Sequence, residues 1–184
     1  MAKSEHAVVL QQLEQAVASL GDYMDPFLIP EVGMNLVFAV AKAKEVQDVA
    51  GIAGRIVRLK GKVHPVGPVE FGASDHMARA VLTAMQFDPT IRSAANIRFS
   101  DTIVGILDEL LFDICEFDRA REPPGIKTMD WGVATCCKEG VPDVIYDRGA
   151  RGKEAMIRVF GEDPAIVTQK IIKVSVRIKD THFD

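Results

Sequence analysis

The 184-residue sequence contains no apolar run long enough to cross a membrane. Its longest apolar stretches, such as residues 36–41, fall far short of the roughly 20 residues that span a bilayer. The N-terminal segment also lacks the uninterrupted apolar core of a secretion signal. We therefore expect no membrane partner and a cytoplasmic location.

Cysteine is scarce as well. The chain has three cysteines, Cys115, Cys136 and Cys137, and no two of them form a CxxC pair. Two adjacent cysteines cannot easily bridge to each other or supply two ligands of a tetrahedral zinc site. In a cytoplasmic protein the usual state of such residues is the reduced thiol. We expect all three cysteines to be reduced.

Several catalytic signatures are missing from the sequence. It has no HExxH, GxGxxG or GxSxG motif and no paired Cys and His signature. Local motifs therefore give no support to a metalloprotease, a Rossmann dehydrogenase or a hydrolase with a nucleophile elbow. The four histidines, His6, His64, His76 and His182, include no HxH pair, which argues against a metal-dependent aldolase or epimerase.

Charge and length limit the class of protein further. Lys and Arg together number 22 against 26 Asp and Glu, which gives a formal net charge of −4. This balance argues against a protein whose main task is to coat nucleic acid. With 48% apolar residues, the chain can supply a sizeable core. We expect a single domain over residues 1–184 that folds alone.

Apolar spacing, capping residues and prolines predict the helices. Residues 7–20 carry apolar side chains at helical spacing, and Gly21 follows them. Ser74 and Ser100 are good N-caps, and Asp163 followed by Pro164 is a typical helix start. We expect five helices: over 7–20, from Ser74 to before Pro89, from Ser100 through Leu111, over 130–139, and from Asp163 onward.

Short apolar or alternating runs between these helices predict strands. We expect them over residues 34–41, 55–59, 96–99, 113–117, 143–146 and 154–160. The Pro- and Gly-rich stretch 63–72 is interpreted as a connection, and the tail from Lys173 to Asp184 as either strand or disorder. Six or seven strands interleaved with five helices predict a three-layer α/β/α fold with a mixed sheet.

The first candidate site precedes the helix that Ser74 begins. Gly72 and Ala73 let a ligand approach the backbone, and the helix N-terminus presents unpaired N–H groups to an anion. Arg79 lies one turn further along, and His76 can donate to an anion or exchange a proton. The segment suits a phosphate group. The alternative interpretation is an ordinary helix cap with a surface histidine.

The second candidate site is the loop 147–154, between two predicted strands. It combines three basic residues with two glycines and includes Arg151, Gly152 and Lys153. It is not a Walker A motif, because Glu154 stands where Ser or Thr would reach magnesium and a strand follows. The alternative interpretation is a solvated hairpin turn.

Three arginines in or beside predicted strands complete the candidates. Arg55 and Arg58 are three residues apart in a strand, so only one of them can face a cleft. Arg98 interrupts an apolar strand and therefore leaves the sheet at its end or has an anionic partner. The residues alone predict an α/β domain with a phosphate site.

Several long segments, taken together, resemble the ThiN-type thiamine-phosphate synthase domain, which in many archaea follows a hydroxymethylpyrimidine kinase. The resemblance covers about residues 8–172, so we expect a stand-alone synthase domain without the kinase. The matching segments are 29–35, 49–58, 65–74, 76–79, 96–100, 117–119, 142–146 and 152–154.

The resemblance implies condensation of hydroxymethylpyrimidine diphosphate with hydroxyethylthiazole phosphate, which gives thiamine phosphate and pyrophosphate. It also implies that Arg55 and His76 are the catalytic residues and that Mg²⁺ accompanies the substrate diphosphate. We expect phosphorylated substrates and no nucleic-acid partner; a homodimer is compatible with the composition. The residues expected to bind substrate phosphates are Gly72, Ala73, Ser74, Arg79, Arg98, Arg151, Gly152 and Lys153.

Related ThiN domains also serve as ligand-sensing halves of transcriptional regulators, so a sensor of thiamine phosphate without catalysis is the alternative function. About 28 residues precede the Ile29 segment, and their single amphipathic helix is too little for a helix-turn-helix. The presence of both Arg55 and His76 favours the enzyme. One departure is Ala155, where proline is expected, and it affects loop stiffness more than chemistry.

Overall fold

The computed structural model describes residues 4–181 and contains five α-helices and nine strands in this range. The helices are α1 (Glu5–Tyr23), α2 (Asp75–Phe87), α3 (Asp101–Glu109), α4 (Thr128–Cys136) and α5 (Pro164–Thr181). The strands are β1 (Leu36–Ala39), β2 (Val49–Ile52), β3 (Ile56–Leu59), β4 (Lys62–Pro65), β5 (Val69–Phe71), β6 (Ser93–Arg98), β7 (Ile114–Glu116), β8 (Val144–Asp147) and β9 (Met156–Gly161). Three short 3-10 helices are η1 (Pro26–Leu28), η2 (Val46–Asp48) and η3 (Arg119–Arg121).

Seven strands form one mixed sheet in the order β5-β2-β1-β6-β9-β8-β7. Every neighbouring pair is antiparallel except β7 and β8, which run parallel. The other two strands, β3 and β4, form a separate antiparallel hairpin in which Ile56 faces Pro65. The expectation of a mixed sheet is confirmed.

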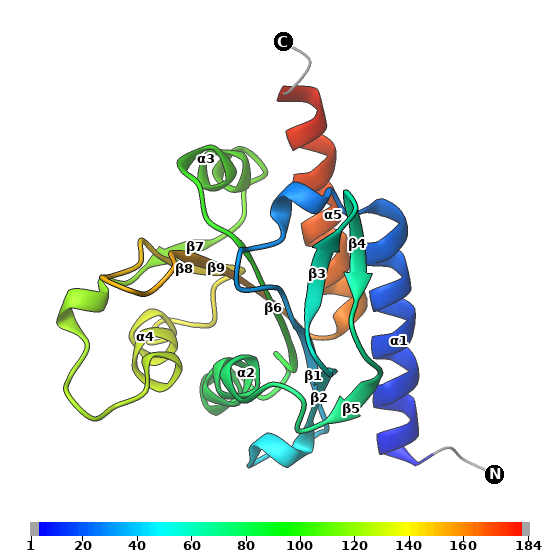
Figure 1. Cartoon of the computed structure of the whole chain (residues 1–184). Helices are drawn as coiled ribbons and strands as arrows, with labels where there is room; N and C mark the ends of the chain where they lie inside the picture. Colours follow the sequence, from blue (N-terminus) through cyan, green and yellow to red (C-terminus); the bar gives the residue numbers. More distant parts are fainter. Residues whose placement is uncertain (1–3, 182–184) are drawn as a thin grey trace.

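Helices cover both faces of this sheet (Figure 1). On one face α5 packs against α1 and α3, and on the other α2 packs against α4. The two faces correspond to two clusters of buried apolar side chains, one for each helical layer. The predicted three-layer α/β/α fold is therefore confirmed.

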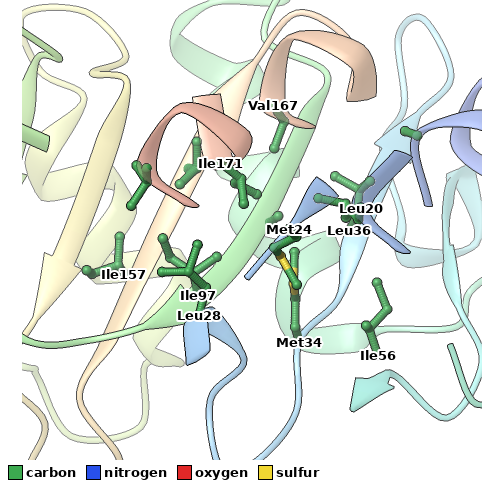
Figure 2. Close-up of a cluster of buried hydrophobic side chains, with 14 of the residues drawn as sticks. Leu20, Met24, Leu28, Met34, Leu36, Ile56, Ile97, Ile157, Val167 and Ile171 are labelled. Atoms are coloured by element: carbon green, nitrogen blue, oxygen red, sulfur yellow. The ribbon is translucent and has the colours of Figure 1, made fainter. Parts of the chain in front are cut away.

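The larger cluster joins elements that are distant in sequence. Figure 2 shows Leu20 of α1, Leu36 of β1 and Ile171 of α5 within one group of buried side chains, and all three are fully buried. Ile56, the first residue of β3, belongs to the same cluster. Burial of this apolar surface stabilises the layers against each other, and it fixes the start of the β3–β4 hairpin where Arg55 lies.

The predicted helix starts are confirmed by their capping contacts. The Ser74 hydroxyl accepts from the N–H of Met77 at 3.4 Å, and the Ser100 hydroxyl accepts from the N–H of Ile103 at 3.1 Å. At the start of α5, the Asp163 carboxylate accepts from the N–H of Ile166 at 2.8 Å. These short-range contacts are set by local sequence.

The mixed sheet has seven strands, but the part of the chain that the structure describes has nine strands in all, because β2, β4 and β5 are not among the six predicted ranges. The stretch 63–72, expected to be a connection, contributes to β4 and β5. Both are short strands at the edge of a sheet. Pro65 is the last residue of β4, and an edge strand tolerates proline because its free side needs no backbone N–H donor. The prolines and glycines around these two short strands give the stretch the local composition of a loop.

The prediction for the C-terminal tail is also wrong as far as Thr181, because α5 continues to that residue. Val174, Val176 and Ile178 alternate with polar residues, which resembles a strand. In the structure, however, Val174 and Ile178 are buried with Ile171, whereas Val176 is 53% exposed. This is the pattern of a helix with one buried face. The last three residues of the chain lie outside the described range.

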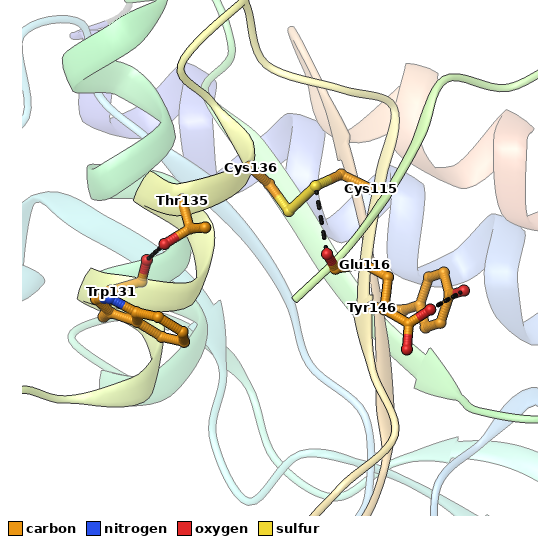
Figure 3. The surroundings of a disulfide bond; sticks show 6 residues. All are labelled: Cys115, Glu116, Trp131, Thr135, Cys136 and Tyr146. Carbon is orange, nitrogen blue, oxygen red and sulfur yellow. Dashed lines mark hydrogen bonds between the residues drawn. A yellow bond between two sulfur atoms is a disulfide. The ribbon is translucent and has the colours of Figure 1, made fainter. Parts of the chain in front are cut away.

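The expectation of three reduced cysteines is wrong. Cys115 of β7 and Cys136 at the end of α4 form a disulfide with a Cα–Cα distance of 5.8 Å (Figure 3). The two are 21 residues apart in sequence, so spacing gave no signal for the pairing. Cys137 is a free, buried thiol, and burial raises its pKa to about 11. The disulfide ties α4 to the edge of the sheet.

Among residues 4–181, no helix combines the length and the apolar character needed to cross a bilayer.

Candidate active site

A cleft of about 500 Å³ opens beside the N-terminus of α2. This volume is typical of small-molecule sites. The walls come from the loop before β1, the start of β3, the first turn of α2, the β8–β9 loop and η3. The lining residues are Val32, Gly33, Asn35, Arg55, Ala73, Ser74, Asp75, His76, Met77, Asn96, Arg119, Gly152, Lys153, Glu154 and Met156.

Six of the ten residues expected at the site line this cleft, namely Arg55, Ala73, Ser74, His76, Gly152 and Lys153. They come from the two candidate segments and from the start of β3, which are far apart in sequence. The fold therefore brings both candidate phosphate loops to the same cleft. The other four residues, Gly72, Arg79, Arg98 and Arg151, are not among its lining residues.

Arg55 has an unusual backbone conformation, with φ of +72°. A residue with a side chain costs about 1–3 kcal/mol in this region, and such strain occurs often at functional sites. Its Nη1 donates to the carbonyl oxygen of Val32. Gly33, with φ of +85°, lies so close that an added Cβ would be 3.2 Å from Arg55 Cδ. The turn and the glycine together direct the Arg55 side chain along the cleft wall.

The first turn of α2 supplies an anion-binding wall. The backbone N–H groups at a helix N-terminus have no partner within the helix, and the helix dipole makes this end positive. Ser74 uses its hydroxyl to cap Met77, so the N–H groups of Asp75 and His76 face the end of the helix that borders the cleft.

His76 has a lowered pKa of about 4. Desolvation contributes most to the change, and the positive charges of Arg158, Arg119 and Arg55 add to it, while Asp147 opposes it. The residue is nevertheless exposed to the solvent of the cleft that it lines. At neutral pH the imidazole is uncharged, so it can donate one N–H to a ligand and accept at the other nitrogen.

Below His76 lies a charged cluster that the sequence analysis missed. The Asp147 carboxylate accepts from Arg119 Nε at 2.7 Å and from Arg158 Nη1 at 2.8 Å. Asp147 and Arg158 have fully buried side chains, whereas Arg119 reaches the cleft. The available signal was Arg158 itself, an arginine inside the apolar run of β9. Arg98, the other arginine inside an apolar strand, is the one that the sequence analysis singles out.

Two buried amides hold the loop before β1 against the sheet. Asn35 bonds both polar groups of Ile52, with Nδ2 donating to the carbonyl oxygen and Oδ1 accepting from the N–H, each at 2.9 Å. Asn96 Nδ2 donates to the carbonyl oxygen of Gly33 at 3.1 Å. These contacts fix the wall that carries Val32 and Gly33.

The β8–β9 loop is anchored to this wall. The Glu154 carboxylate accepts from the backbone N–H groups of Glu31 at 3.0 Å and Val32 at 3.2 Å. Gly149, with φ of +76°, lets the two ends of the loop approach closely, because a Cβ added to this residue would be 2.6 Å from the Lys153 carbonyl oxygen. Lys153 is half exposed, and its Nζ lies 4.0 Å from Glu122.

The four remaining predicted residues have other surroundings. Arg79 pairs with Asp75 at 3.0 Å and lines a neighbouring hollow together with His76 and Lys153. Arg98 donates to the Ile29 carbonyl oxygen at 3.3 Å. The Arg98 guanidinium also lies 4.9 Å from the Phe27 ring centroid. Gly72 lies against the Gln47 side chain. Arg151 is exposed in the β8–β9 loop.

The acidic side chains at the cleft already have partners within the protein. Among residues 4–181, no group of three or more His, Cys, Asp or Glu side chains is placed to hold one. The two carboxylates that line the cleft are engaged, Asp75 with Arg79 and Glu154 with backbone N–H groups.

Comparison with known proteins identifies the family. The model of the family "Thiamine-phosphate synthase ThiN" matches residues 12–173. The chain belongs to the ThiN family. The sequence-based assignment is thus confirmed.

Two curated ThiN relatives come from archaea. The bifunctional thiamine biosynthesis protein ThiDN of Methanocaldococcus jannaschii is 43% identical over 89% of this chain, and the chain spans only 39% of its length. The thiamine-phosphate synthase ThiN of Methanothermobacter thermautotrophicus is 37% identical over 85% of this chain and 86% of its own length.

Solved structures agree with the ThiN assignment. A crystal structure described as the C-terminal domain of phosphomethylpyrimidine kinase has a TM-score of 0.88 and 44% identity. It covers 91% of this chain and 98% of that one. A sugar-phosphate aldolase from Thermotoga maritima, with a TM-score of 0.51 and 10% identity over 97% of each chain, shares only the fold.

Proposed function

We propose that this protein is a transferase that joins hydroxymethylpyrimidine diphosphate to hydroxyethylthiazole phosphate, giving thiamine phosphate and pyrophosphate. The observation that carries the proposal is the convergence of Arg55, Arg119 and Lys153 with the α2 N-terminus around an uncharged His76 in one cleft. Positive groups placed in this way can bind phosphoryl oxygens, although the protein as a whole is acidic.

In this reaction the bond between the pyrimidine methylene carbon and the diphosphate oxygen breaks, and the thiazole nitrogen bonds to that carbon. The departing pyrophosphate carries the developing negative charge, and fixed positive groups lower the barrier by stabilising it. Arg55 is placed for this role, because its side chain is held along the cleft wall by Val32 and Gly33. The rigid walls keep the two substrates in line.

His76 serves as a hydrogen-bond donor to a phosphoryl oxygen. A group with a pKa of about 4 carries no proton to transfer as an acid at neutral pH. Negative charge from a bound diphosphate raises that pKa, since an opposite charge favours the imidazolium form. The hydrogen bond from His76 to the phosphoryl oxygen therefore strengthens as negative charge builds up on the departing pyrophosphate.

We propose that Mg²⁺ enters the cleft with the substrate diphosphate, coordinated by phosphate oxygens and water. Magnesium commonly keeps several waters and binds through substrate phosphates. This agrees with cleft carboxylates that already have other partners. The residues proposed to bind phosphate groups are those of the α2 N-terminus, from Ala73 to His76, and Gly152 and Lys153.

We propose a cytoplasmic location, no nucleic-acid partner and a homodimer in solution. The Cys115–Cys136 disulfide is an exception to the usual reduced state of cytoplasmic thiols, of a kind known from intracellular proteins of hyperthermophiles. Leu59 and Val66, on and just after the β3–β4 hairpin, are 48% and 54% exposed, and the proposed dimer would cover them. Light scattering of the purified protein tests the dimer, and a monomer mass would contradict it.

The test of the function is an assay of the purified full chain with both substrates and Mg²⁺. We expect thiamine phosphate and pyrophosphate to appear in equal amounts, as measured by chromatography. Omission of either substrate is the control and should abolish both products. Binding of thiamine phosphate with no turnover would contradict the proposal and indicate a sensor.

A further inference from the structure

The cluster below His76 contains two guanidinium groups and one carboxylate, so it holds an excess of one positive charge. Both carboxylate oxygens of Asp147 accept two hydrogen bonds each from groups of the protein. Its Oδ1 accepts from Arg119 Nε and from the Gly149 N–H, at 2.7 and 2.8 Å. Its Oδ2 accepts from Arg158 Nη1 at 2.8 Å and from Arg119 Nη2 at 3.3 Å.

Arg158 is the unusual member of the cluster. Its side chain is fully buried in β9, and its Nε and Nη2 have no hydrogen-bond partner among the described residues. The other polar contact of Nη1 is the Met156 carbonyl oxygen at 3.3 Å, and the Phe117 ring lies 5.4 Å away. An unbalanced buried charge destabilises a protein, so its presence needs an explanation.

A purely structural role does not supply this explanation. One arginine bonded to Asp147 is enough to join the neighbouring elements, and Arg119 already makes two bonds to that carboxylate. A second, unbalanced arginine raises the positive potential at the floor of the cleft. A bound anion above the cluster would restore the balance of charge.

Arg119 is the member that can reach such an anion. Its side chain is 8% exposed and lines the cleft with His76 and Arg55. Because Nε and Nη2 bond Asp147, the guanidinium is held in a fixed orientation that leaves Nη1 for a ligand. Arginine held in this way is well suited to phosphoryl oxygens.

We propose that Arg119 is a substrate-binding residue that donates to a phosphoryl oxygen in the cleft, and that Asp147 and Arg158 are positioning residues for it. Asp147 orients the guanidinium, and Arg158 supplies the charge that the phosphoryl anion balances. The identity of the ligand as the substrate diphosphate rests on the proposed function, whereas the anion site itself does not.

The experiment measures the binding of inorganic pyrophosphate to the full chain by isothermal titration calorimetry, which needs no turnover. Arg119→Met should weaken binding at least 10-fold, because it removes a charge-assisted contact. Arg121→Met is the matched control, since Arg121 belongs to the same 3-10 turn but has an 83% exposed side chain. This control should stay within about twofold of the wild type, because screened surface charges contribute little.

Arg158→Met separates the positioning role from a structural one. The variant leaves Asp147 paired with Arg119, so its melting temperature without ligand should not fall, while its pyrophosphate affinity should fall at least threefold. A structural role predicts the reverse, with a lower melting temperature and unchanged affinity. If Arg158→Met does not fold, the comparison of Arg119→Met with Arg121→Met still decides the case.

Wild-type affinity in Arg119→Met would overturn the proposal, as would equal losses in Arg119→Met and Arg121→Met. Absence of pyrophosphate binding by the wild type would overturn it too. A protein that binds pyrophosphate through Arg119 but forms no thiamine phosphate would contradict the proposed function and leave the anion site standing. The two proposals can therefore fail separately.

Discussion

Glu154 and Arg55 meet at the backbone of one residue, Val32. The Glu154 carboxylate accepts from the Val32 N–H at 3.2 Å, and Arg55 Nη1 donates to the Val32 carbonyl oxygen. The β8–β9 loop and the turn before β3 are thus connected through a single peptide segment. The placement of the cleft arginine depends on an acidic residue from the opposite wall.

The first prediction follows from this connection. Glu154→Ala removes the acceptor for the Glu31 and Val32 N–H groups and should lower kcat/KM about 10-fold, since misplaced catalytic groups lose much of their effect. Steady-state kinetics measures the change. Glu154→Gln keeps one acceptor oxygen and should lose less. The control Glu162→Ala, at an exposed position, should match the wild type, and an unchanged Glu154→Ala would contradict the role of this anchor.

The second prediction concerns Lys153. Lys153→Ala should raise the apparent KM for a phosphorylated substrate roughly 10-fold, because a charge-assisted contact contributes about 1.5–3 kcal/mol. The contact acts on substrate and transition state alike, so kcat should change less. Lys138→Ala, at an exposed position, serves as the control. Unchanged KM for both substrates would mean that the β8–β9 loop is only a turn.

The third prediction is a dependence of stability on pH. The pKa of His76 is lowered on folding from 6.5 to about 4, so the unfolded chain binds more protons between these values. The free energy of unfolding should therefore rise with pH across this window, and the contribution of His76 should be lost as the pH falls from 6.5 toward 4. Solvent that reaches the ring screens its interactions with the neighbouring charges.

Urea unfolding at pH 5 and pH 7 measures this contribution. The gain in stability between pH 5 and pH 7 should be smaller in His76→Gln than in the wild type. His64→Gln, on the exposed edge strand β4, is the matched control and should retain the wild-type difference. An NMR titration of His76 with a midpoint at or above 6.5 would show that the assigned environment is wrong.

The fourth prediction concerns the Cys115–Cys136 disulfide. It closes a loop of 21 residues, and opening such a loop lowers the free energy of unfolding by about 3 kcal/mol. Urea unfolding with and without dithiothreitol measures the difference. A double variant, Cys115→Ser with Cys136→Ser, should behave like the reduced wild type and not respond to the reductant. Equal stability of oxidised and reduced wild type would contradict the prediction.

Contacts between neighbouring residues could be predicted from the sequence, and distant ones could not. Ser74 and Ser100 bond N–H groups three residues away, so the sequence itself locates these helix starts. The bonds from Arg119 and Arg158 to Asp147 cross 28 and 11 residues and depend on the assembled sheet. The same limit applies to the disulfide.

Candidate site residues show the same limit. Glycine and basic residues at loops indicated the two segments that line the cleft. Composition could not show that Arg98 would bond the Ile29 carbonyl oxygen and lie over Phe27, because both partners lie about 70 residues earlier in the chain. The prediction for the C-terminal tail was wrong for another reason. Val174, Val176 and Ile178 fit the period of a strand, and only packing shows which of them are buried.

The most direct test of the account compares kcat for Arg55→Ala with kcat for Arg58→Ala in the formation of thiamine phosphate. Arg55 lines the cleft, whereas Arg58, three residues further along, is an exposed residue that is not among the lining residues. We predict a loss on the order of 100-fold or more for Arg55→Ala, the scale of a removed preorganised electrostatic group, and wild-type kcat for Arg58→Ala. Equal kcat values for the two variants would contradict the claim that this cleft performs the synthase reaction.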